Sequence, residues 1–131
     1  MALLTSEIAD QLIREQGLNV SIPNNYTAIG DSAFRRKSLA GVTIPSTITS
    51  IARWAFETNN LTTLEIPDSV TFIGEKAFSG NQLQSVKIST GLTSLAGNTF
   101  SSNRLTAVEI PKNVDTIGDA VFMHNRLKSI T

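Results

Sequence analysis

The chain repeats one pattern of residues every 22 positions, and this repetition limits its fold more than any other feature. Isoleucine, phenylalanine and leucine each keep the interval through five copies. The columns are Ile22, Ile44, Ile66, Ile88 and Ile110; Phe34, Phe56, Phe78, Phe100 and Phe122; and Leu39, Leu61, Leu83, Leu105 and Leu127. Because no insertion interrupts these columns, each copy is expected to form one coil of a solenoid, which buries its apolar side chains by stacking on its neighbours.

One copy predicts a short strand, a turn and a second extended segment. Apolar and polar residues alternate over residues 64–66, which is typical of a strand half buried in a sheet. Pro67 ends this strand because proline has no N–H to donate to the ladder. Val70 and Ile73 favour a second extended segment, and residues 75–78 favour a single helical or 3₁₀ turn. This turn carries a phenylalanine into the core, so the five phenylalanines are expected to stack in one column.

A column of asparagines stands shortly before each next strand. We expect a structural role, in which the amides bond backbone groups that the turn leaves unpaired and also bond one another. In the first copy Lys37 interrupts the column. The asparagines are Asn59, Asn81, Asn103 and Asn125.

These columns resemble the BspA-like bacterial variety of the leucine-rich repeat family, whose repeat runs close to L-x-x-L-x-I-P-x-x-V-x-x-I-G-x-x-A-F-x-x-N/C. The resemblance covers roughly residues 17–131. It implies an α/β-type repeat fold, a right-handed leucine-rich repeat solenoid with a parallel β-sheet on one face. It also implies a surface or secreted binding module, although a fold alone does not determine an activity. The Asn or Cys that ordinary leucine-rich repeats carry just after the strand is not kept, and its places hold Asn25, Thr47, Ser69, Gly91 and Asn113.

The two ends of the array differ. Residues 1–16 are expected to form an N-terminal capping helix with Thr5 or Ser6 as N-cap, an apolar stripe beginning at Leu4, and Gly17 at its end. Such a helix covers apolar side chains and strand edges that the first coil would expose. The solenoid is expected to fill residues 17–131, with coils at 17–38, 39–60, 61–82, 83–104 and 105–126 and a partial coil at 127–131. Leu127 and Ile130 belong to this last, uncovered coil, which predicts either a fragment of a longer array or a homodimer formed end to end.

Composition and motifs argue against catalytic, metal-binding and nucleic-acid-binding sites. Eleven basic residues balance eleven acidic ones, and the chain has no cysteine, so neither a general attraction to nucleic acid nor a thiolate site is expected. The single histidine, His124, occupies a turn position and has no nucleophile motif near it. The acidic column of Asp31, Glu75 and Asp119 lies in alternate coils, about 10 Å apart, which is too far for a shared metal ion. We therefore expect no enzyme, no cofactor and no metal, and the basic triplet at 35–37 is interpreted as a solvated corner.

Membrane insertion and a signal peptide are also not expected. No stretch approaches the roughly 18 apolar residues of a membrane span, and the first residues lack a basic start followed by an apolar run. These features do not determine the cellular compartment. The family resemblance suggests the cell surface or secretion.

Two surfaces remain for binding. The strands present an outward column that includes Thr43, Glu65, Lys87 and Glu109, whose alternating charges are expected to favour the register of neighbouring strands. Trp54 and Phe72 interrupt columns that are otherwise small or polar, which predicts an exposed aromatic patch. An alternative is that Trp54 lies flat over the neighbouring turn.

The sequence thus favours a non-catalytic module that contacts a protein or a glycan, as a segment of a larger bacterial surface or secreted protein. The alternative is a structural spacer that associates with itself through the uncapped C-terminal coil.

Overall fold

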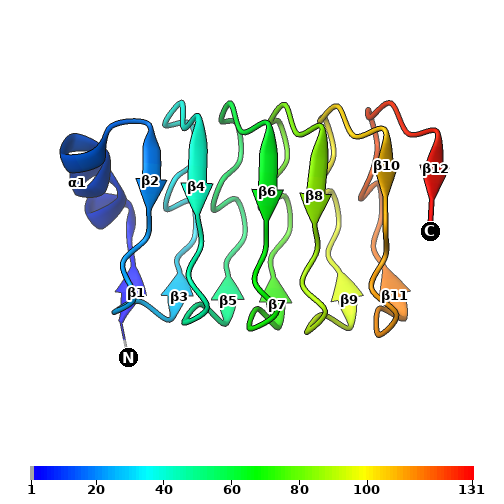
Figure 1. Cartoon of the computed structure of the whole chain (residues 1–131), viewed down its shortest axis with the longest axis horizontal. Coiled ribbons are helices and arrows are strands. Elements are labelled where there is room, and N and C mark those ends of the chain that lie inside the picture. The colour runs from blue at the N-terminus through cyan, green and yellow to red at the C-terminus, as the bar shows by residue number, and fades with distance from the viewer. Residues whose placement is uncertain (1) are drawn as a thin grey trace.

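The computed structural model describes residues 2–131 and winds as a stack of coils from one end of the molecule to the other (Figure 1). Each coil contributes one strand to each of two rows. The first row, called the sheet face, consists of β2 (Asn19–Ser21), β4 (Gly41–Thr43), β6 (Thr63–Glu65), β8 (Ser85–Lys87), β10 (Ala107–Val108) and β12 (Ser129–Ile130). The second row consists of β1 (Leu3–Leu4), β3 (Ala28–Ile29), β5 (Ser50–Ile51), β7 (Phe72–Ile73), β9 (Ser94–Leu95) and β11 (Thr116–Ile117). The expected strand and second extended segment of each copy are confirmed.

Neighbouring strands that pair within a row do so in parallel, and from β2 onward each paired residue lies opposite the residue 22 positions away. Leu64 pairs with Val86, for example, and Ser50 pairs with Phe72. Hydrogen bonding is not continuous along the rows. The sheet face divides into the pairs β2–β4, β6–β8 and β10–β12, whereas β1, β3, β5 and β7 form one ladder that stops before the pair β9–β11.

The phenylalanine column forms the interior of the solenoid. Neighbouring rings have centroids 5.1, 5.2, 5.9 and 6.0 Å apart, and their planes differ by only 5° to 7°. The first four rings are fully buried and the last, Phe122, is half-buried. The expected stacked column is confirmed. Since each ring stacks on the ring of the neighbouring coil, the column joins the cores of successive repeats.

The expected helical or 3₁₀ turn over residues 75–78 is wrong. Lys76 has a φ of 59°, in the left-handed region, and its N–H donates to the carbonyl of Gly97 in the next coil at 3.1 Å. Phe78 N–H likewise donates to Thr99 at 3.0 Å. Only the N–H groups in between bond back along the chain, from Ala77 to Gly74 at 3.3 Å and from Ser79 to Lys76 at 3.2 Å, so the segment is a run of β-turns and not a helix.

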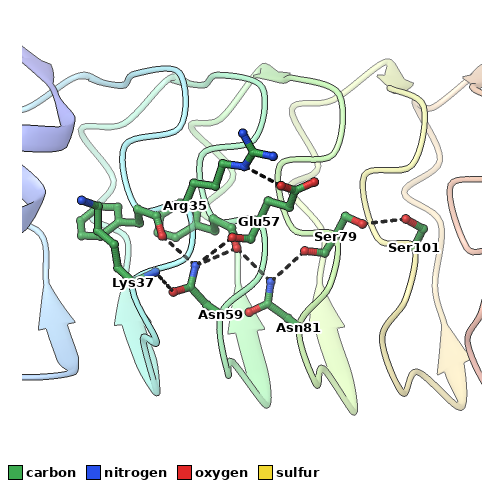
Figure 2. Close-up of polar contacts among 9 residues, drawn as sticks. Arg35, Lys37, Glu57, Asn59, Ser79, Asn81 and Ser101 are labelled. Carbon is green, nitrogen blue, oxygen red and sulfur yellow. Dashed lines mark hydrogen bonds and ion pairs between the residues drawn. The ribbon is translucent and has the colours of Figure 1, made fainter.

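The asparagine column is structural, as expected, but its amides bond the backbone (Figure 2). Asn81 Nδ2 donates to the carbonyls of Phe56 and Phe78 at 3.0 and 3.1 Å, and its Oδ1 accepts from Leu61 N–H at 3.1 Å. Asn59, Asn103 and Asn125 make the equivalent bonds. Among residues 2–131 no two of these amides bond each other, because both of their polar atoms are already occupied. Each amide therefore joins two coils at the corner before a strand.

The N-terminal end is covered by helix α1 (Ser6–Gln16). The side chain of Thr5 accepts from Ile8 N–H as the N-cap, and Gly17 follows the last turn with a φ of 79°, as expected. Leu4 does not belong to the helix, because Leu3–Leu4 form β1 and extend the second row. Met1, the first residue of the expected cap, lies outside the described residues.

Lys37, which interrupts the asparagine column, fastens this helix to the first coil. Its Nζ lies 2.5 Å from Asp10 Oδ1 and 3.1 Å from Ser6 Oγ, and its backbone N–H donates to Asn59. An asparagine at this place would be too short to reach the helix. The interruption thus marks the coil that meets the cap.

Candidate binding surface

The outward column of the sheet face carries charges that lie side by side without pairing. Glu65 and Lys87 are opposite one another on β6 and β8, and Glu109 occupies the next position along the column. All three are exposed, and none takes part in an ion pair within residues 2–131. The register that places Glu65 beside Lys87 is therefore as expected, and the contribution of these charges to it stays a prediction. Thr43 continues the column and is also exposed.

Shallow hollows follow the same face, with volumes between about 240 and 470 Å³. The largest is lined by β6, β8 and Val42. Two others lie where β4 faces β6 and where β8 faces β10, the places at which the ladder is open. The four residues predicted for this face border these hollows, which are also lined by the half-buried Val42 and Val86.

Trp54 and Phe72 lie in different surroundings. Phe72 is 57% exposed on β7. Trp54 is half-buried, and the guanidinium groups of Arg35 and Arg53 each lie 5.0 Å from the centre of its ring. Arg35 also donates to Glu57 at 2.6 Å (Figure 2). The tryptophan is therefore surrounded by charged groups, and the two arginines are contact residues that the sequence interpretation missed.

At the C-terminal end Leu127 is half-buried and Ile130 is 56% exposed. Ile117 and Met123, in the coil before, are each 52% exposed. The exposed apolar side chains of this end therefore outnumber the pair predicted from the sequence, and together they are called the apolar end surface.

The acidic side chains and the single histidine offer no cluster of metal ligands within residues 2–131. No three histidine or acidic side chains lie together there as metal ligands would, and His124 is exposed on its turn. Asp31 Oδ2 lies 3.6 Å from Arg53 Nε instead. The pKa of Asp68 lies below its ordinary value, first because the backbone N–H of Thr90 donates to its carboxylate at 3.0 Å and second because of the Thr90 side chain. In this part of the chain no helix is long and apolar enough to cross a membrane.

Comparisons with known proteins agree with this architecture. A family model described as "BspA type Leucine rich repeat region (6 copies)" matches residues 15–128. A leucine-rich repeat protein from Bacteroides ovatus ATCC 8483 is 23% identical, with a TM-score of 0.73 over 86% of this chain and 37% of its own. A leucine rich cell surface protein from Faecalibacterium prausnitzii A2-165 is 28% identical, with a TM-score of 0.66 over 86% of this chain and 38% of its own. The chain thus spans well under half the length of either solved protein, and none of the curated proteins matches it.

Proposed function

Since the chain belongs to the BspA-type leucine-rich repeat family, we propose that it is a non-catalytic interaction module that docks a protein or a glycan on its sheet face. The observation that carries this proposal is the coincidence of hollows and unpaired charges on that face, where Glu65, Lys87 and Glu109 are free to meet a partner. Burying such charges against a complementary partner gives specificity more than affinity.

A place within a larger bacterial surface protein is part of this proposal. It is supported by the two solved structures, both bacterial, one of which is described as a cell surface protein. Each of them is more than twice as long as this chain.

The test uses arrays of glycans and of extended peptides, probed with the labelled chain. A charge-reversed variant, Glu65→Lys with Glu109→Lys, alters only exposed positions of the sheet face. Glu75→Lys is the matched control, because Glu75 is an exposed acid on a turn outside that face. Binding that the double variant loses and the control keeps supports the proposal.

The Trp54 and Phe72 patch is the competing surface within the same function. The double variant Trp54→Ser with Phe72→Ser is predicted to leave sheet-face binding intact. If this variant abolishes binding while the charge-reversed variant does not, the partner docks on the aromatic patch and the sheet face is the wrong assignment.

The second candidate is a structural spacer that associates with itself. The apolar end surface supports it, since exposed side chains of this kind gain free energy when a second copy covers them. Sedimentation velocity separates the two candidates: Ile130→Asp converts a dimer to a monomer if the spacer proposal is right, and leaves the sedimentation coefficient unchanged if it is not.

A further inference from the structure

Two hollows of the sheet face are copies of one another. Pocket A is lined by Val42, Thr43, Ile44, Ser46, Glu65 and Pro67, with a volume of about 360 Å³. Pocket B is lined by Val86, Lys87, Ile88, Thr90, Glu109 and Pro111, with a volume of about 240 Å³. Every residue of pocket B stands 44 positions after its counterpart in pocket A, so the two pockets are the same site repeated after two coils.

Each pocket lies between two neighbouring strands that form no ladder, β4 and β6 for pocket A and β8 and β10 for pocket B. Ile22 N–H donates to Thr43 at 3.1 Å and Ile66 N–H donates to Lys87 at 2.9 Å. The equivalent bonds, from Ile44 N–H to Glu65 and from Ile88 N–H to Glu109, are not made within residues 2–131. Both pockets therefore contain a backbone donor and a backbone acceptor that no other strand uses.

The rest of each pocket is an aliphatic floor with a polar rim. The floor of pocket A comes from Val42, Ile44 and Pro67, and its rim carries the hydroxyl of Thr43 opposite the carboxylate of Glu65. In pocket B the counterparts at the rim are Lys87 and Glu109. Pocket A is consequently acidic and pocket B carries both charges, so a basic group on the ligand is favoured at pocket A alone.

The distance between the pockets limits what can fill both. Two coils at the spacing of neighbouring strands give about 10 Å. Three residues of a polyproline II helix advance about 9.3 Å and return to the same side of the chain. An extended β-strand places same-side residues about 6.7 or 13.4 Å apart, and neither distance matches that between the two pockets.

An α-helix matches the spacing with residues seven apart, at about 10.5 Å, but its own backbone hydrogen bonds are already made. A polyproline II peptide has free backbone N–H and C=O groups where proline is absent, and can meet the unused groups of Ile44 and Glu65. An uncharged glycan has no basic group to meet the carboxylate of Glu65 in pocket A.

We infer that pockets A and B together bind a proline-rich peptide in the polyproline II conformation, with proline or another apolar residue at every third position and a basic residue beside pocket A. This inference rests on the proposed function and specifies its partner. The peptide runs along the axis of the solenoid, across the strands.

The test is an NMR titration of the ¹⁵N-labelled full chain with a capped peptide, an arginine followed by three Pro-Pro-Ala units. The amide signals of Ile44 and Ile88 are expected to shift together with one dissociation constant. Glu65→Gln weakens binding about twofold to fivefold, as for an exposed charge pair. The matched variant Glu75→Gln leaves the dissociation constant unchanged.

Two further probes separate the alternatives. A capped alanine-based helical peptide with a single lysine, which carries the same charge, and a β-1,4-linked glucose hexasaccharide are titrated in the same way. If either shifts the sheet-face amides and the proline-rich peptide does not, the peptide chemistry is overturned while the docking face stands. If the proline-rich peptide leaves Ile44 and Ile88 unshifted up to millimolar concentration, or shifts only signals around Trp54, the inference is wrong.

Discussion

Replacing Asn81 by alanine is the most direct way to measure what joins one coil to the next. The side chain is only 6% exposed, and its amide makes one bond as acceptor and two short bonds as donor. The carbonyls of Phe56 and Phe78 each keep a second bond, from Asn59 and Asn103 respectively. Only Leu61 N–H loses its single partner.

The expected loss of stability follows from these hydrogen bonds. A buried N–H without a partner costs about 1 to 3 kcal/mol, and each lost bond to a carbonyl that keeps another costs about 0.5 to 1 kcal/mol. We therefore expect Asn81→Ala to lower the free energy of unfolding by about 3 kcal/mol. The neighbouring residue Asn60 is exposed, and its side chain accepts only a long bond from Gln82, so Asn60→Ala is the matched control and changes stability by less than about 0.5 kcal/mol.

The assay is urea denaturation followed by far-UV circular dichroism and by fluorescence of the single tryptophan. Coincident transitions check that unfolding is two-state, a necessary check in a repeat array. Asn81→Asp adds a sharper comparison, because it keeps an acceptor for Leu61 N–H but turns a carboxylate oxygen toward two carbonyls. At neutral pH it is expected to be at least as unstable as the alanine variant. If both variants stay within 0.5 kcal/mol of Asn60→Ala, water replaces the amide and the asparagine column does not hold the coils together.

Three other predictions concern the cap, a close approach of two coils, and pH. Lys37→Ala removes the bonds of the Lys37 ammonium to Asp10 and Ser6 and lowers stability by about 1 kcal/mol, more at low salt than at high salt. Urea denaturation at two ionic strengths checks this, and a salt-independent loss would contradict an ionic contact. Gly74→Ala places a Cβ 2.3 Å from a backbone nitrogen of the preceding coil, and urea denaturation is expected to show a loss of stability of more than about 2 kcal/mol. The control Gly97→Ala, whose Cβ meets nothing nearer than 3.5 Å, is expected to lose less than about 0.5 kcal/mol, and equal losses of stability would refute the clash. In a ¹³C NMR titration the pKa of the Asp68 carboxyl is expected to be lower in the folded protein than in urea, because the backbone N–H of Thr90 donates to it. The stability that this carboxylate contributes is present above its unfolded pKa and is lost as the pH falls through its folded pKa. Identical pKa values in both states would contradict this prediction.

The period of the sequence was sufficient to predict the solenoid, because its apolar columns have only one arrangement in which all are buried. Phe78, for example, packs between its counterparts in the coils on either side, as a constant interval requires. The cap was predictable for a similar reason, since Thr5 and Gly17 are residue types that begin and end helices.

Details that depend on small differences between equivalent positions were not predictable. Ile22, Ile44 and Ile66 are identical residues in identical columns, yet Ile44 N–H alone among the three lacks its ladder bond. The sequence shows no signal for this alternation, and hence none for pockets A and B. Lys37 was visible as an exception in its column, but its contact with Asp10 required the position of the helix.

Charges on the sheet face illustrate a further limit. Opposite charges at Glu65 and Lys87 predict attraction, but exposed side chains gain little from pairing in water and lose rotamer freedom. In the structure they remain apart. Their position was predictable, whereas their availability to a partner was not.

The proposed site exists only where the ladder of the sheet face is open, and amide hydrogen exchange of the free chain tests these open places directly. Ile22 and Ile66 are predicted to exchange slowly, because their N–H groups donate to the next coil, and Ile44 and Ile88 to exchange much faster, because theirs do not. Alternating slow and fast exchange along these four isoleucines supports the open places at pockets A and B. Equal protection of all four amides would mean that the ladder is continuous and that the proposed site does not exist.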